Sequence, residues 1–133
     1  MRSTFITLAV AAVLSTTAVA QQQHVQVLSF LPDDAFTVTD YYKQNVYDTE
    51  DNKIGDIKDV LIDKSGQIKA LIVGVGGFIG VGEKDVAVPF DAVKAATKDN
   101  KTYLTMNANK DELKNAAGYT YDRASTKWVP EKR

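Results

Sequence analysis

Cysteine is absent from this 133-residue sequence, and histidine occurs once, as His24. The missing cysteine excludes disulfide bonds, thiolate metal sites, a cysteine nucleophile and a lipid-anchored cysteine. A single histidine argues against a zinc site or a histidine base, because neither has the partners it needs. No serine stands in the context of a nucleophile elbow. We therefore expect no catalytic residue, no resident cofactor and no metal centre.

A block of like charge is also lacking. The 16 Lys and Arg residues and the 17 Asp and Glu residues are interspersed, and the formal net charge at pH 7 is −1. Nucleic-acid binding depends on a basic patch that neutralises phosphates. The charge pattern therefore predicts no nucleic-acid partner.

The only long apolar run lies at the start of the chain. Arg2 precedes an apolar stretch over 5–14, and Ala18-Val19-Ala20 supplies an A-x-A cleavage site. This pattern predicts a signal peptide over 1–20 and a periplasmic mature chain without stable membrane insertion, because the run is short for a spanning helix. The single positive charge leaves uncleaved anchoring as an alternative.

The next segments alternate between turn residues and β patterns. Residues 21–36 form an N-terminal linker. The apolar positions of 53–63 and 67–75 predict a β-hairpin, whose turn is provided by Asp63, Ser65 and Gly66. The irregular spacing in the first of these strands predicts a bulge near Lys58 and Asp59. The run Leu71–Val75 is continuously apolar, which indicates that both faces of that strand are covered.

Further strands are expected on both sides of this hairpin. Residues 85–90 form one, with Pro89 at an edge or strand end because it lacks an N–H. Residues 102–106 form another, and 36–48 supply one or two more. The stretch 91–97 is expected to make a short helical turn.

The hydrophobic period changes in the last part of the chain, 107–133, and this change predicts a helix followed by a tail. Asn109 and Glu112 have the spacing of a capping box, and Gly118 can end a helix of about two turns. Two tyrosines and the tryptophan follow, and we expect them to cover an edge or mouth of the domain: Tyr119, Tyr121 and Trp128.

Five of the eight glycines lie between Gly74 and Gly82. Their spacing fits neither the G-x-G-x-x-G fingerprint nor the P-loop, and Glu83 stands where a P-loop has lysine. Both motifs lead into a helix that holds the anion, whereas a strand pattern follows here. The run therefore predicts a hairpin connection. The apolar residues Phe78, Ile79 and Val81 either fold back as a lid on the core or present a patch to a partner.

The stretch 46–93 resembles the PRC-barrel domain family, which is named for the H subunit of the photosynthetic reaction centre and includes the C-terminal domain of a ribosome-maturation factor. The matching elements run in the family's order and spacing: Val46-Tyr47-Asp48, Ile54-Gly55, Asp59-Val60-Leu61-Ile62-Asp63, Gly66, Ala70-Leu71-Ile72-Val73, Gly76-Gly77-Phe78-Ile79-Gly80 and Val86-Ala87-Val88-Pro89-Phe90. The resemblance implies a mainly β fold, a PRC-type barrel of about five to six strands over 37–106. It also implies docking onto larger assemblies. Where the family often has glycine in its first turn, Asn52 is expected to adopt positive φ.

Acidic residues gather before and within the first strand of the hairpin. They match an EF-hand loop poorly, since the glycine at its sixth position and the glutamate at its twelfth are missing. A solvated acidic rim and weak cation binding remain the two interpretations of these residues: Asp48, Glu50, Asp51, Asp56, Asp59 and Asp63.

These observations together predict an exported, non-catalytic protein-binding or assembly module of the bacterial envelope. The alternative is a sensor of a small ligand or cation that uses the barrel mouth and the acidic rim. The partner is expected to be a protein, and a homo-oligomer is left open. The candidate partner-binding loop consists of Gly76, Gly77, Phe78, Ile79, Gly80, Val81, Gly82, Glu83 and Lys84.

Overall fold

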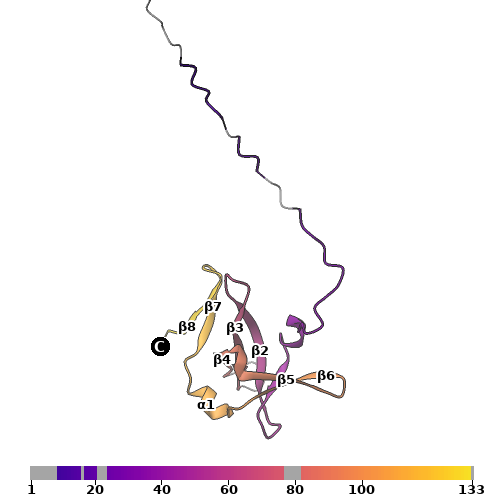
Figure 1. Ribbon diagram of the computed structural model, residues 1–133. Coiled ribbons are helices and arrows are strands. Elements are labelled where there is room, and N and C mark those ends of the chain that lie inside the picture. Colours follow the sequence, from indigo (N-terminus) through magenta and orange to yellow (C-terminus); the bar gives the residue numbers. More distant parts are fainter. Residues whose placement is uncertain (1–8, 16, 21–23, 77–81, 133) are drawn as a thin grey trace, which may run out of the picture. The chain divides into compact units, whose positions relative to one another are not determined.

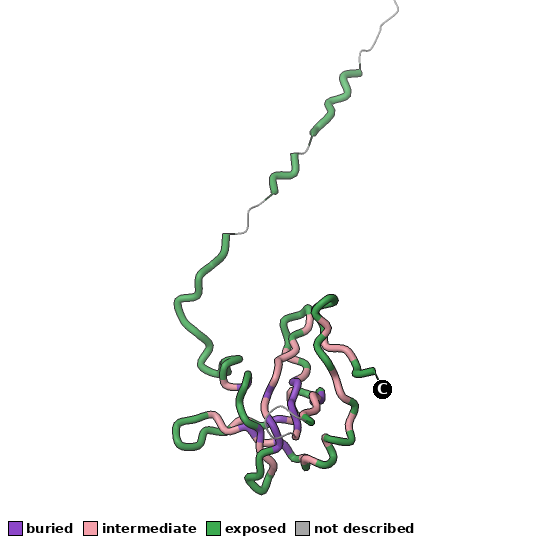
Figure 2. Tube along the Cα trace, turned by 180° about the vertical axis from the view of Figure 1, so that it is seen from behind, coloured by how far each residue is buried: buried purple, intermediate pink, exposed green. Residues whose placement is uncertain are grey.

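The computed structural model describes residues 9–15, 17–20, 24–76 and 82–132, and the chain divides into two units, Met1–Asp33 and Asp34–Arg133. The described residues of the first unit form neither helix nor strand and are exposed (Figure 2). Within the described ranges, no helix is long and apolar enough to cross a membrane.

The second unit is mainly β (Figure 1). Six strands form one sheet in the order β4-β3-β2-β1-β6-β5, and β7 pairs with β8 in a separate hairpin. The elements along the chain are η1 (Val38–Asp40), β1 (Asn45–Tyr47), β2 (Lys53–Ile62), β3 (Ile68–Val75), β4 (Lys84–Pro89), η2 (Phe90–Ala92), β5 (Val93–Lys98), β6 (Lys101–Met106), α1 (Lys110–Lys114), β7 (Tyr119–Asp122) and β8 (Lys127–Pro130).

The β2–β3 hairpin forms as its turn residues predict. The Asp63 carboxylate accepts hydrogen bonds from the backbone N–H groups of Ser65 and Gln67, at 2.9 and 3.0 Å. Gly66 adopts φ +87°, a conformation that glycine reaches without a steric penalty. The pairing with β3 shifts register between Ile57 and Asp59, which confirms the predicted bulge.

The six-stranded sheet curls so that its two edge strands approach each other. A flat sheet of this size would separate β4 from β5 by about 24 Å, at about 4.8 Å per step, yet only the three residues of η2 connect them. Val86 of β4 and Val93 of β5 also belong to one core cluster. No ladder joins these two edges within the described residues, so hydrogen bonds do not close the sheet.

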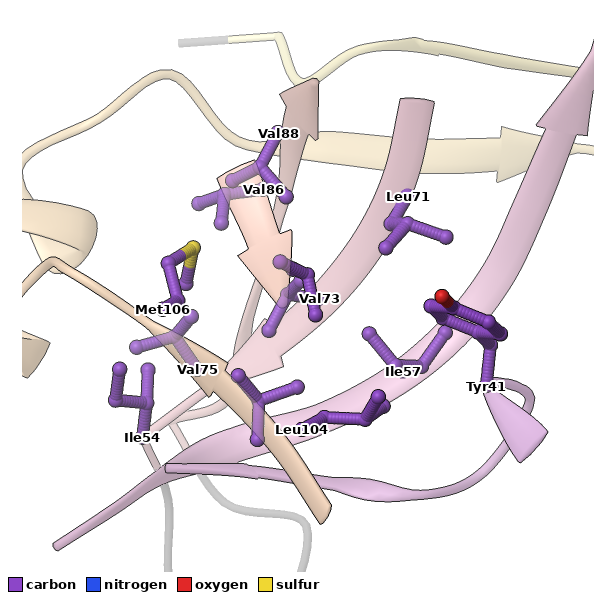
Figure 3. Close-up of a cluster of buried hydrophobic side chains, with 12 residues drawn as sticks. Tyr41, Ile54, Ile57, Leu71, Val73, Val75, Val86, Val88, Leu104 and Met106 are labelled. Atoms are coloured by element: carbon purple, nitrogen blue, oxygen red, sulfur yellow. The ribbon is translucent and has the colours of Figure 1, made fainter. Parts of the chain in front are cut away.

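The second half of strand β3, Leu71–Val75, is buried on both faces. Leu71, Val73 and Val75 point into the core beneath the sheet (Figure 3), and every residue from Leu71 to Val75 is buried. Ile72 lies on the opposite face, where its register partner Asp59 accepts a hydrogen bond from Trp128 Nε1 of β8 at 2.7 Å. The C-terminal hairpin therefore covers the second face, which explains the unbroken apolar run.

The expected and observed elements differ in several places. Of the helical turn expected over 91–97, only Asp91 and Ala92 belong to a helix, η2, and Val93–Lys98 is a strand because it pairs along its whole length with β6. Positive φ occurs at Asp51, at +64°, and not at Asn52. The capping box of Asn109 and Glu112 forms as predicted, but α1 ends at Lys114, before Gly118.

Candidate functional site

The glycine-rich connection between β3 and β4 has two well-defined ends. The strands pair up to Val75 and Lys84, and Gly76 and Gly82 adopt φ values of +78° and +76°. The predicted loop residues Gly77, Phe78, Ile79, Gly80 and Val81 lie outside the described residues. The structure thus defines the base of the candidate loop, which is formed by the paired ends of β3 and β4.

An ion pair holds the β4 side of the base. Glu83 Oε1 lies 2.9 Å from Lys58 Nζ, which is also 3.3 Å from Asp56 Oδ2. The hydrogen bond with Glu83 is the main cause that raises the pKa of Lys58, which stays protonated. A Cβ on Gly74 would stand 1.9 Å from Glu83 Oε1, so the glycine leaves the space that this carboxylate occupies.

Lys84 fastens the same strand to the end of α1. Its Nζ donates a hydrogen bond to the backbone oxygen of Lys114 at 2.8 Å. A Cβ on Gly118 would lie 3.1 Å from Lys84 Cε and 2.5 Å from Glu131 Oε2, so the stem of Lys84 runs close beside the tail. Glu83 and Lys84, both expected at the rim of a partner site, are engaged in bonds within the domain.

Carboxylates surround Lys58 on this face of the sheet. Asp56 and Asp85 both lie opposite Gly74, one on each neighbouring strand. Burial raises the pKa of Asp85, and the negative charge of Glu83 adds to that effect. Asp85 is therefore the carboxylate of this group that the fold makes harder to ionise.

Several of the acidic residues expected to form a rim have separate local bonds. Asp48 accepts hydrogen bonds from the N–H groups of Glu50 and Asn52 at 2.8 and 2.9 Å, and the bond from Asn52 is the main cause that lowers its pKa. Asp51 accepts from the hydroxyl of Tyr103. Within the described ranges, no group of three or more His, Cys, Asp or Glu side chains could hold a metal ion.

A polar groove opens beside the β5–β6 hairpin, and the sequence patterns did not predict it. Tyr47 and Tyr103 stack with ring centroids 4.8 Å apart, and Lys98 Nζ lies 4.8 Å from the centroid of the Tyr103 ring. The groove has a volume of about 890 Å³ and is lined by Asp40, Gln44, Asn45, Tyr47, Lys98, Asp99, Asn100, Lys101, Thr102 and Tyr103. The signal that could have identified this groove is the alternation of side chains along two strands, which points every second residue outward.

A more apolar groove lies between β2 and the β7–β8 hairpin. Its volume is about 420 Å³, and it is lined by Asp59, Val60, Leu61, Ile62, Tyr121, Thr126, Lys127 and Trp128. Tyr121 and Trp128 meet edge to face with centroids 5.7 Å apart. We expected these two rings to cover an edge or mouth of the domain, and they lie beside β2. The hairpin that carries them was not predicted.

The comparisons with known proteins agree with this architecture. No curated protein matches the chain. A model of the PRC-barrel domain matches residues 33–113, which include all six strands of the sheet and most of α1, whereas β7 and β8 lie beyond the match. Because the match covers more than half of the chain, this protein belongs to the PRC-barrel domain family.

Proposed function

We propose that this chain is an exported, non-catalytic module of the bacterial envelope that binds a protein partner through the glycine segment 76–84. In this proposal, the signal peptide 1–20 directs the chain to the periplasm, and the curled six-stranded sheet serves as the small barrel that carries the loop.

The anchored base of the glycine segment is the observation that supports this proposal. Glu83 is bonded to Lys58, and Lys84 is bonded to the end of α1. A loop that leaves a rigid scaffold at fixed points loses less conformational freedom on binding. Phe78, Ile79 and Val81 supply the apolar side chains that a protein interface places at its centre.

Crosslinking and pull-down from a periplasmic extract test the loop, with partners identified by mass spectrometry. Phe78→Asp should abolish capture of the partner, while Val38→Asp, at an exposed position on η1, should retain it. Circular dichroism tests whether both variants fold. If folded Phe78→Asp still captures the partner, the loop is not the site; if Phe78→Asp unfolds, the loop belongs to the core.

Cell fractionation and N-terminal sequencing test the export step. The mature chain should begin at Gln21 and appear in the periplasmic fraction. An intact N-terminus in the membrane fraction would indicate an uncleaved anchor, and an intact chain in the cytoplasm would contradict export.

A small-ligand sensor is the second candidate, and the polar groove beside Tyr47 and Tyr103 favours it. Amide, hydroxyl, ammonium and carboxylate groups line that groove, which suits a polar metabolite. A thermal-shift screen with Ca²⁺ and a metabolite panel tests it, because a ligand that binds only the folded state raises the melting temperature. No shift across the panel would remove this candidate.

A further inference from the structure

The groove between β2 and the β7–β8 hairpin follows the edge of a strand. Four consecutive residues of β2, Asp59 to Ile62, line it. Successive side chains of a strand point to opposite faces of the sheet. A groove that touches four in a row therefore runs along the edge of β2 and not over one of its faces.

This part of the edge has no partner strand. β1 pairs with β2 from Lys53 to Asp56. The contact extends to Ile57, whose carbonyl accepts from the N–H of Lys43 and whose N–H donates to the carbonyl of Gln44. Beyond Ile57, no strand among the described residues pairs with that side of β2, although its other side pairs with β3 as far as Ile62. The N–H of Val60 already donates to Asp59 Oδ1 at 2.8 Å, so a strand added here would bond the other backbone N–H and C=O groups of this edge.

The side chains around the edge are mainly apolar and are held in place. The bond from Trp128 Nε1 to Asp59 Oδ2, 2.7 Å long, fixes the indole. Ile62 is 58% exposed and Tyr121 is 44% exposed, and both line the same groove. Both therefore offer apolar area that a partner could bury.

Two charged side chains of opposite sign line the groove, Lys127 and Asp59. Lys127 is exposed, and none of the ion pairs found in the described residues involves it. The other charged lining residue, Asp59, already accepts the hydrogen bond from Trp128. A ligand with a carboxylate near Lys127 would complement this arrangement.

We propose that this groove binds an extended peptide segment of another protein by adding it as a strand to β2 between Lys58 and Ile62. In this mode, backbone hydrogen bonds provide the attachment and alternate side chains provide the selectivity. The preferred peptide carries apolar residues two apart, which pack against Ile62, Tyr121 and Trp128, and an acidic residue beside Lys127. This surface is distinct from the glycine segment and does not depend on it.

The only tryptophan of the chain is Trp128, so its fluorescence reports directly on the groove. The probe is the capped peptide Thr-Val-Thr-Val-Thr-Glu, and the control is the same peptide with proline at the central threonine. Proline has no N–H and cannot extend a sheet from that position. The probe should change the fluorescence saturably and slow amide exchange at Asp59–Ile62, whereas the proline peptide should do neither. Absence of a saturable change, or equal binding of both peptides, would overturn the proposal.

Two variants separate the parts of the surface. Ile62→Lys removes an exposed apolar contact and should weaken the probe about tenfold. Lys127→Glu should weaken it roughly two- to fivefold, and should have no effect when glutamine replaces the peptide's glutamate. Phe78→Asp should bind as the wild type does, which keeps this test apart from that of the glycine segment.

For each step of the proposal there is one experimental result that would contradict it. Unchanged affinity of folded Ile62→Lys would place the peptide elsewhere and overturn the strand addition. Equal affinity of the glutamate and glutamine peptides would overturn the role of Lys127. Dimerisation of the free protein that Ile62→Lys abolishes, measured by sedimentation, would assign the edge to a second copy of this chain in place of a peptide.

Discussion

At the residue scale, the hydroxyl of Tyr103 on β6 donates a hydrogen bond to the carboxylate of Asp51, in the turn before β2. This bond is the largest cause that raises the pKa of Tyr103 from 10.0 to about 12. Because only the protonated phenol can donate it, the fold favours the neutral form of the side chain.

The first prediction concerns stability at high pH. Since the folded-state pKa of Tyr103 lies above its ordinary value of 10.0, the bond should stabilise the domain fully below pH 10 and be lost as the pH rises through about 12. Urea midpoints measured between these limits should fall more steeply for the wild type than for Tyr103→Phe. Asp51→Asn, which tolerates positive φ, should flatten the profile likewise. Parallel profiles would contradict the assignment.

The second prediction compares two glycines with different constraints. A Cβ on Gly55 would stand 1.9 Å from the backbone oxygen of Gly74, so Gly55→Ala should lower the free energy of unfolding by about 3 kcal/mol. Gly66 has open space but φ +87°, so Gly66→Ala should cost about 1 kcal/mol. Chemical denaturation of the two variants gives the ratio of their losses in the free energy of unfolding. Equal costs would show that strand spacing adjusts around Gly55.

At the element scale, the sequence predicted those strands and helices whose boundaries depend on residues nearby in the sequence. The β2–β3 hairpin has its turn chemistry within 63–67, and α1 has its capping box within four residues. A short helical turn was expected over 91–97, and only the pairing with β6 makes Val93–Lys98 a strand. The parallel pairing of β1 with β6 has no local signal at all.

The candidate site was predictable to the same limited extent. The glycine run was correctly expected to join two strands, because no helix pattern follows it. Two carboxylates of the acidic stretch have partners from distant parts of the sequence, whereas Asp48 and Asp63 bond to backbone groups within four residues. Tyr103 is 52 residues from Asp51, and Trp128 is 69 residues from Asp59. No spacing rule within the acidic stretch could have identified these partners.

The third prediction tests the cap of α1, which is the element that anchors Lys84. The Asn109 side chain accepts a hydrogen bond from the N–H of Glu112 at 2.8 Å, and the Glu112 side chain accepts one from the backbone N–H of Asn109. Asn109→Ala should therefore lower the free energy of unfolding by about 1 kcal/mol. Asn107→Ala, an exposed position before the helix, serves as the control and should change it little. A cost shared equally by both would contradict a specific capping effect.

At the scale of the folded domain, the C-terminal hairpin lies beyond the residues matched by the family, yet it forms part of the packing. Trp128 bonds to Asp59, Lys84 reaches past Gly118, and the N–H of Glu131 donates to the oxygen of Gly118 at 3.0 Å. The bond from Trp128 to Asp59, the register partner of Ile72, places the hairpin over the face of the sheet that includes Ile72. The family sheet and its C-terminal addition should therefore unfold together.

The fourth prediction follows from this shared packing. A chain that ends at Asn115 would expose Ile72 and the apolar side chains around it, so its free energy of unfolding should fall by at least about 2 kcal/mol. A chain that ends at Glu131 keeps β7, β8 and the bond to Gly118, and should unfold at the wild-type midpoint. Trp128→Phe should cost about 1 kcal/mol, because it removes the bond to Asp59 but keeps most of the ring. Urea denaturation followed by circular dichroism measures all three. If the chain ending at Asn115 matched the wild type, the hairpin would rest on the sheet without stabilising it, and the strand edge proposed for peptide binding would lack a firm aromatic wall.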